Sequence, residues 1–168
     1  DGGKAQELAR ALADHKIFIQ HLIDVLPTPV YLKNLESVVT RCNGAFAELF
    51  DLQVTDVIGK KLVEVAPKDL AKTITDHEKA LLVKEGQVRD EITFALGDDN
   101  RTALFAASSL KGPSGSIAGT IGSLIDVTSL KKAQAEVAEA AQRLTGLLES
   151  APIGVGISSR ETGVFQFF

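Results

Sequence analysis

The sequence predicts an α+β domain built from antiparallel β-strands, with an amphipathic helix before it and another after it. Three observations predict this class. Two β-branched segments form a hairpin around residue 35, three further β-rich segments fill residues 87–127, and the segments between and outside them repeat apolar residues at helical spacing. The chain has 168 residues, enough for one compact domain with additional helices.

The composition excludes several classes of structure and partner. Hydrophobic residues make up 45% of the chain and charged residues 24%, and the mean hydropathy is +0.11, so the chain is not a disordered segment. A net charge of −4 without a basic block argues against nucleic acid. No apolar run reaches the roughly 18 residues of a membrane span, and one Cys with three scattered His residues offers no structural zinc site. We expect a cytoplasmic module without a membrane segment.

Residues 1–26 are predicted to be a helix that ends at Pro27. Apolar residues recur in it at alternating intervals of three and four, which is the heptad seam of coiled coils. The seam contains Leu8, Leu12, Ile19, Leu22 and Leu26. The helix could pack on its own domain or pair with a second copy, and the spacing alone allows both.

The segment 30–84 is predicted to contain a hairpin followed by helices. Val30–Lys33 and Ser37–Cys42 are β-branched segments on either side of a short turn, and Asn43-Gly44 ends the second one. A short helix is expected over 45–52. A longer helix is expected over 68–84, with one face formed by Leu70, Ile74, His77 and Leu81.

Three strands are predicted in the last part of the domain. Residues 87–96 alternate, with Val88, Ile92, Phe94 and Leu96 on one face. Turn sequences at 97–100 and 112–116 separate this strand from strands at 101–111 and 117–127. In the last strand we expect the face with Ile117, Ile121, Ile125 and Val127 to point to the interior.

A second helix with a heptad seam follows the last strand without a linker. Asp126-Val127-Thr128 leads into it, and Asp126 or Thr128 can cap its first turn. Its seam consists of Leu130, Ala133, Val137, Ala140, Leu144 and Leu147. Two seams in one short chain favour a homodimer that pairs through the flanking helices.

The order of elements and five short motifs resemble the PAS sensor fold. The motifs are LIDVLPTPVYLKN, CNGAFAELF, VIGKKLVEV, GDDNR and GSIAGTIGSLIDVTSLKKAQ, in family order over residues 22–134. The resemblance implies a five-stranded antiparallel sheet with helices on one face. Near the end, LLESAPIGVGI is similar to HLIDVLPTPVYL, as if a second PAS domain began there. We expect a helix over 1–26, a PAS domain over 27–128, a signalling helix over 129–149 and the truncated start of a second domain over 150–168.

The resemblance also implies a function. PAS modules of multidomain signalling proteins sense a ligand or a conformational change, and here Asp126, Val127 and Thr128 would transmit it to the following helix. A downstream effector in the same chain, such as a histidine kinase or a cyclic-dinucleotide enzyme, would be the partner. The chain itself carries no catalytic motif, so we expect no enzymatic activity in this segment. The residues expected to line the ligand cavity are His77, Leu81, Ile92, Phe94, Phe105, Ile121 and Ile125.

Three cofactor interpretations follow from the resemblance. Haem would use His77, which lies on the helix where haem-binding relatives place their iron ligand. Flavin is disfavoured, because the photoactive Cys of such relatives lies in an Asn-Cys-Arg-Phe-Leu-Gln run that the surroundings of Cys42 do not match. We favour the third interpretation, in which a small apolar ligand or none occupies the cavity. Without a ligand, the module would be a constitutive dimerisation scaffold.

Overall fold

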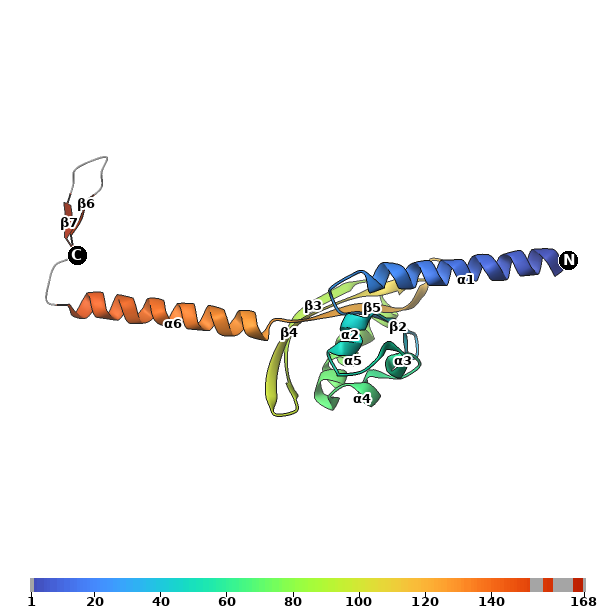
Figure 1. The fold of residues 1–168 in the computed structure, drawn as a ribbon, viewed down its shortest axis with the longest axis horizontal. Coiled ribbons are helices and arrows are strands. Elements are labelled where there is room, and N and C mark those ends of the chain that lie inside the picture. Colours follow the sequence, from blue (N-terminus) through green and yellow to red (C-terminus); the bar gives the residue numbers. More distant parts are fainter. Residues whose placement is uncertain (1, 152–155, 159–164, 168) are drawn as a thin grey trace. The chain divides into compact units, whose positions relative to one another are not determined.

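The computed structural model describes residues 2–151, 156–158 and 165–167 (Figure 1). Residues Asp1–Thr128 belong to one compact unit and Ser129–Phe168 to a second. The first unit contains a five-stranded antiparallel sheet of order β2-β1-β5-β4-β3, which confirms the predicted fold class. Its strands are β1 (Val30–Asn34), β2 (Val39–Cys42), β3 (Gln87–Leu96), β4 (Asp99–Lys111) and β5 (Ile117–Asp126).

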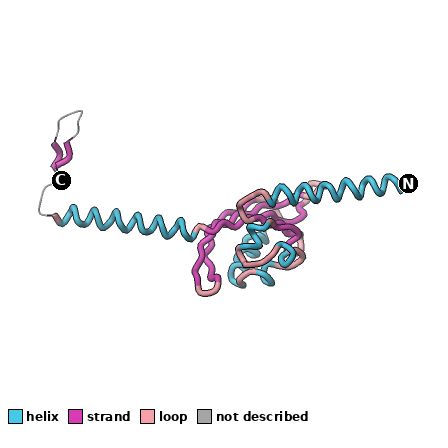
Figure 2. The backbone as a smooth tube through the Cα atoms, in the orientation of Figure 1, coloured by secondary structure: helices cyan, strands magenta, loops and turns pink. Residues whose placement is uncertain are grey.

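Helices cover one face of this sheet, as Figure 2 shows. They are α2 (Gly44–Glu48), α3 (Val54–Val57), α4 (Leu62–Val65) and α5 (Lys68–Val83). The face they cover is the inner face, where the hydrophobic core lies. Tyr31, Phe105 and Leu124 of the sheet are fully buried there, together with Phe46 of α2 and Leu70 of α5. Burial of large apolar side chains on both layers holds the helices against the sheet.

The face of β5 that points inward is not the predicted one. Thr120, Gly122 and Leu124 are buried, whereas Ile125 is 41% exposed and Ile121 belongs to the outer face with it. Val127, which follows the last residue of β5, is buried as predicted. The prediction was wrong because the inner face carries a glycine in place of a large apolar residue. Gly122 pairs with Tyr31 of β1, and a Cβ at Gly122 would lie 2.3 Å from the Tyr31 ring. The absence of a side chain therefore makes room for Tyr31.

Asn43 joins the end of the first helix to the domain. Its Oδ1 accepts hydrogen bonds from the backbone N–H groups of Val30 and Phe46, both at 3.0 Å, and so caps α2. Its Nδ2 donates to the carbonyl oxygens of Ile23 at 3.0 Å and Thr28 at 2.8 Å. One buried amide thus satisfies backbone groups of α1, β1, α2 and the connection between α1 and β1.

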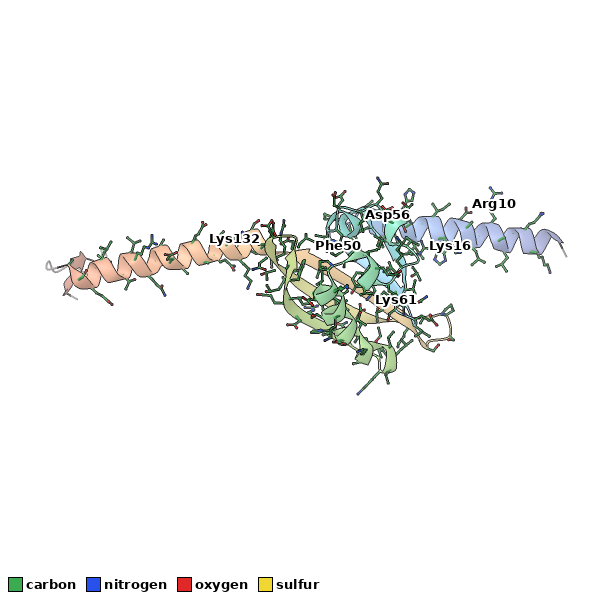
Figure 3. All side chains as sticks on the ribbon, turned by 90° about the horizontal axis from the view of Figure 1, so that it is seen from below. Arg10, Lys16, Phe50, Asp56, Lys61 and Lys132 are labelled. Atoms are coloured by element: carbon green, nitrogen blue, oxygen red, sulfur yellow. The ribbon has the colours of Figure 1, made fainter. Side chains whose placement is uncertain are left out.

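The two flanking helices leave their apolar seams uncovered. In α1 (Gly2–Asp24) only Ile23 is buried, and in α6 (Thr128–Ser150) no residue is. Figure 3 shows side chains that project above and below each helix. At least half of the residue surface is exposed at Leu8, Leu12, Leu22, Leu130, Val137, Leu144 and Leu147, while Ile19 is half-buried. Pairing with a second copy stays a prediction.

The segment after α6 is described only in part. β6 (Gly156–Ser158) and β7 (Phe165–Phe167) pair antiparallel, with Ile157 opposite Gln166. Residues 152–155, 159–164 and 168 lie outside the described residues. The prediction that a second PAS domain begins at residue 150 therefore stays a prediction.

Candidate functional site

A buried polar cluster lies in the core between β1 and α5. Tyr31 and Lys33 alternate along β1 and both point to the inner face, and Glu78 faces them from α5. The Tyr31 hydroxyl donates to Glu78 Oε1 at 2.5 Å, and Lys33 Nζ donates to Glu78 Oε2 at 2.6 Å. The three side chains are almost completely excluded from solvent. We call them the buried triad.

Burial dominates the electrostatics of the buried triad. It lowers the pKa of Lys33, although the charge and hydrogen bond of Glu78 act in the opposite direction. It raises the pKa of Tyr31 well above 10, and Glu78 raises it further. Each carboxylate oxygen has one donor, so the charge of Glu78 is compensated within the cluster. The triad therefore links α5 to β1 through an ion pair in an apolar interior.

Four of the predicted cavity residues do come together. Leu81, Ile92, Phe94 and Phe105 are all members of the same buried core cluster. His77 lies at its edge, with its ring edge-on to Phe105 at 5.7 Å between ring centres. Ile121 and Ile125 are separated from this group because they lie on the opposite face of the sheet.

His77 connects α5 to the edge strand β3. Its Nδ1 lies 2.8 Å from the backbone oxygen of Thr73, and its Nε2 lies 2.8 Å from Asp90 Oδ2. Both neighbours are acceptors, so only the doubly protonated imidazolium can donate to both. The hydrogen bond that His77 donates to the Thr73 carbonyl oxygen raises the pKa of His77, and so do the interactions with Asp90, while burial lowers it. Iron ligation through Nε2 would require the loss of the Asp90 contact.

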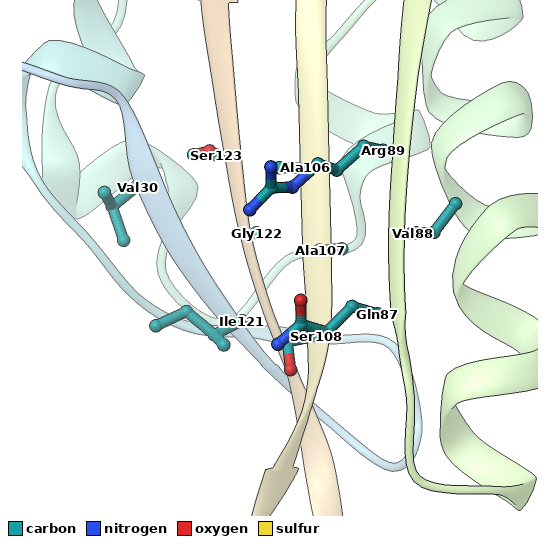
Figure 4. Close-up of a pocket in the computed structure, with 10 residues that line it drawn as sticks. All are labelled: Val30, Gln87, Val88, Arg89, Ala106, Ala107, Ser108, Ile121, Gly122 and Ser123. Carbon is teal, nitrogen blue, oxygen red and sulfur yellow. The ribbon is translucent and has the colours of Figure 1, made fainter.

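Ile121 lines a shallow groove on the outer face of the sheet (Figure 4). The groove has a volume of about 280 Å³. Val30 and Ile121 form one side, and the side chains of Gln87 and Arg89 reach across β4 from the other. Small residues form its floor, among them Ala106. This mixed surface is distinct from the core in which we expected Ile121.

The exit from the sheet is clamped by side-chain and backbone contacts. Asp126 accepts a hydrogen bond from the Thr128 N–H at 2.9 Å and from Arg101 Nη1 at 3.0 Å. Thr128 Oγ1 accepts from the Thr102 N–H at 2.9 Å, and the Val127 N–H donates to the Thr102 oxygen at 2.8 Å. Burial raises the pKa of Asp126, but the bonds from Thr128 and Arg101 outweigh it and lower that pKa. The three predicted transmission residues thus form one exit clamp with β4.

Cofactor chemistry has few candidates among the described residues. Cys42 is fully buried, and burial with the nearby charge of Asp24 raises the pKa of its thiol to about 11. A thiol in that state is a poor nucleophile. Within the described ranges, no three His, Cys, Asp or Glu side chains gather as a metal site, and no helix is long and apolar enough to cross a membrane.

The buried triad was not predicted from the sequence. Glu78 was not considered for the core, because a charged residue is rarely buried, and His77 was placed on the apolar face of its helix instead. The spacing from Ile74 to Glu78 to Leu81 is four and three, as helical as the spacing through His77. Lys33 carried a similar signal, since it lies two residues after Tyr31 in a strand.

Comparison with known proteins identifies the class. Residues 23–132 match the PAS fold family, and the chain belongs to it. Over 146 residues the chain is 29% identical to the virulence sensor protein BvgS of Bordetella pertussis, and over 123 residues it is 28% identical to BvgS of Bordetella parapertussis. These matches cover 84% and 71% of the chain but 11% and 10% of the relatives. The chain thus spans about a tenth of the length of the curated relatives it matches.

Solved structures agree with this assignment. The PAS domain of Bordetella pertussis BvgS superposes with a TM-score of 0.61 at 25% identity, over 82% of this chain and 99% of that one. A Vibrio cholera VqmA–ligand–DNA complex superposes with a TM-score of 0.60 at 25% identity, over 80% and 60%. The chain is therefore a PAS domain similar to that of a virulence sensor protein, which confirms the predicted family.

Proposed function

We propose that the chain is the sensing and dimerisation module of a larger cytoplasmic signalling protein, and that it passes changes in its core to α6 through the exit clamp. The observation that carries the proposal is the direct passage from β5 to α6. Asp126 is the last residue of β5 and Thr128 the first of α6, and both are fixed to β4. A short, clamped connection transmits a shift that a flexible linker would absorb.

The buried triad supplies an input for this transmission. It joins α5 to β1, and β1 pairs with β5 along five residue pairs from Val30↔Ser123 to Asn34↔Gly119. A change in the position of α5 therefore reaches β5 through one intervening strand. In energetic terms, a ligand or partner that prefers one arrangement of α5 shifts the population of arrangements at the exit clamp.

The ligand we favour is a small apolar molecule in the core beside α5, or none. Leu81, Ile92, Phe94 and Phe105 provide the apolar surface, and the solved VqmA complex shows that a protein with this fold binds a ligand. Haem is the second candidate, with His77 as ligand after release of Asp90. If no ligand binds, the module is a dimerisation scaffold. The effector, a histidine kinase or a cyclic-dinucleotide enzyme, would follow in the same chain.

Dimerisation is supported by the uncovered seams. Leu144 of α6 is 63% exposed, and α1 leaves Leu8 and Leu12 similarly exposed. Exposed apolar residues at heptad spacing are typical of helices that pair. We expect Leu144→Glu to lower the mass measured by light scattering, whereas Gln142→Glu, on the same helix but outside the seam, leaves it unchanged. An unchanged mass for both variants would remove the argument for pairing through α6.

The role of the exit clamp is tested with spin labels on α6. In a chain with Cys42→Ala and a single label at Gln142→Cys, the distance distribution reports the pairing of two α6 helices. We expect Asp126→Ala to broaden or shift this distribution. Asp99→Ala is the matched control, because Asp99 contacts the same Arg101 at 3.6 Å but is largely exposed. Identical distributions in the Asp126 variant and the parent would refute transmission through the clamp.

A further inference from the structure

A second groove lies on the helical side of the domain, and none of its lining residues belongs to the buried triad or to the exit clamp. It has a volume of about 470 Å³ and is formed by the β1–β2 turn, the first turn of α4 and one face of α5. The turn contributes residues 35–37, and α4 with its N-cap Lys61 contributes residues 61–63. From α5 come Lys68, Lys72 and Lys79, which lie on one side of the helix at intervals of four and seven. We call it the lysine groove.

The lysine groove is positively charged in a chain whose net charge is −4. Four lysines line it, the fourth being Lys61, against the two carboxylates of Glu36 and Asp76. Lys79 pairs with Asp76 at 2.6 Å and, together with Lys72, lowers the pKa of that carboxyl group, although burial acts in the opposite direction. In the part of the chain that the structure describes, the ammonium groups of Lys68 and Lys72 have no ion-pair partner.

Two exposed apolar side chains lie among these lysines. Leu35 in the β1–β2 turn is 51% exposed and Val63 in α4 is 53% exposed, and both line the groove. The groove thus offers an apolar contact with positive charge around it, and a complementary occupant would have an apolar side chain with carboxylates around it.

The span of the charges decides between a small anion and a polypeptide. Lys68 and Lys79 are 11 residues apart in a helix that rises about 1.5 Å per residue, so the cationic face extends over about 16 Å. One carboxylate or phosphate cannot contact both ends of such a face. We propose that the lysine groove docks an acidic, amphipathic polypeptide segment of a partner protein, which places successive carboxylates along α5 and an apolar side chain against Leu35 and Val63.

The test uses a fluorescein-labelled helical peptide as probe. It carries glutamates at the spacing of Lys68, Lys72 and Lys79 and a leucine between them, and a second peptide has lysines in place of the glutamates. We expect the glutamate peptide alone to bind in an anisotropy titration, with an affinity that falls as added salt shortens the Debye length to about 10 Å. The double variant Lys68→Gln/Lys72→Gln should bind it about 2- to 25-fold more weakly, the range that two exposed ion pairs provide.

A charge-matched control separates the groove from the overall charge. Lys4→Gln/Lys84→Gln removes the same charge outside the groove and should leave the affinity unchanged. The proposal is overturned by equal binding of the lysine peptide, by an equal loss in the control variant, or by no binding at low salt. Displacement of the peptide by an equal concentration of inorganic phosphate would also overturn it, since the occupant would then be a small anion.

Discussion

Neutralising one member of the buried triad should destabilise the domain far more than neutralising an exposed ion pair. Glu78→Gln preserves the shape of the side chain but leaves the Lys33 ammonium group in an apolar interior without its counter-ion. Removing one partner of a buried ion pair typically costs about 3–5 kcal/mol. A single domain is stable by only about 5–15 kcal/mol, so this one change should remove roughly a fifth or more of the free energy of unfolding.

The double variant isolates the interaction. Lys33→Met/Glu78→Gln removes both charges together, so the penalty for an isolated buried charge disappears and the loss should be smaller than the sum of the single losses by about 2 kcal/mol or more. Glu85→Gln is the matched control. Glu85 pairs with Lys111 at 2.8 Å, but both side chains are about half exposed or more, and its neutralisation should cost less than about 1 kcal/mol.

Urea unfolding followed by far-ultraviolet circular dichroism measures these differences. The chain has no Trp and a single Tyr, so the absorbance of ionised tyrosine at alkaline pH also reports Tyr31 alone. We expect it to appear only as the domain unfolds, because burial holds the pKa of Tyr31 well above 10. The reasoning fails if Glu78→Gln costs no more than Glu85→Gln, or if the losses of the two single variants add without coupling.

Three further outcomes follow from named contacts. Asn43→Ala should cost at least about 2 kcal/mol in urea unfolding, because it removes a helix cap and leaves buried backbone groups without their hydrogen-bond partner. Gly122→Ala should cost about 1–3 kcal/mol by overpacking, and Tyr31→Leu in the same chain should relieve part of that loss. The pKa of His77 is raised in the folded state, so protonated His77 contributes up to about 1 kcal/mol to the free energy of unfolding. This contribution is fully present below the unfolded pKa of about 6.5, and it is lost as the pH rises through the folded pKa. Asp90→Asn should lower the folded pKa in an NMR titration, and an unchanged pKa would contradict the assigned contact.

Long elements with a regular apolar period could be predicted from the sequence. The predicted bounds of β3 are those observed, and α5 ends one residue before the predicted end, because ten or more residues give the periodicity enough repeats. The four-residue helices α3 and α4 were missed for the opposite reason. One helical turn contains too few positions to establish a period.

The candidate site was less accessible, because its chemistry contradicts the hydrophobicity pattern. Reading apolar residues as interior placed Ile125 inside and passed over Glu78, although the structure has them the other way round. Each of these errors depends on a contact with a residue distant in the sequence, which the spacing of apolar residues does not reveal. Glu78 is buried because Tyr31 and Lys33 donate to it across 45 or more residues, and Gly122 is buried because it leaves space for the Tyr31 ring.

The strand order has a consequence for synthesis. β5 is the last strand of the sheet to leave the ribosome, yet it lies between β1 and β4 in the finished sheet. Until residue 126 has emerged, the nascent chain can form only the β1–β2 and β3–β4 hairpins, which are not paired with each other. Joining them brings together residues some ninety positions apart, a slow kind of closure for a growing chain. The strand that completes the sheet is thus also the one that leads into α6. The helix therefore begins to emerge only after all five strands of the sheet have been synthesised.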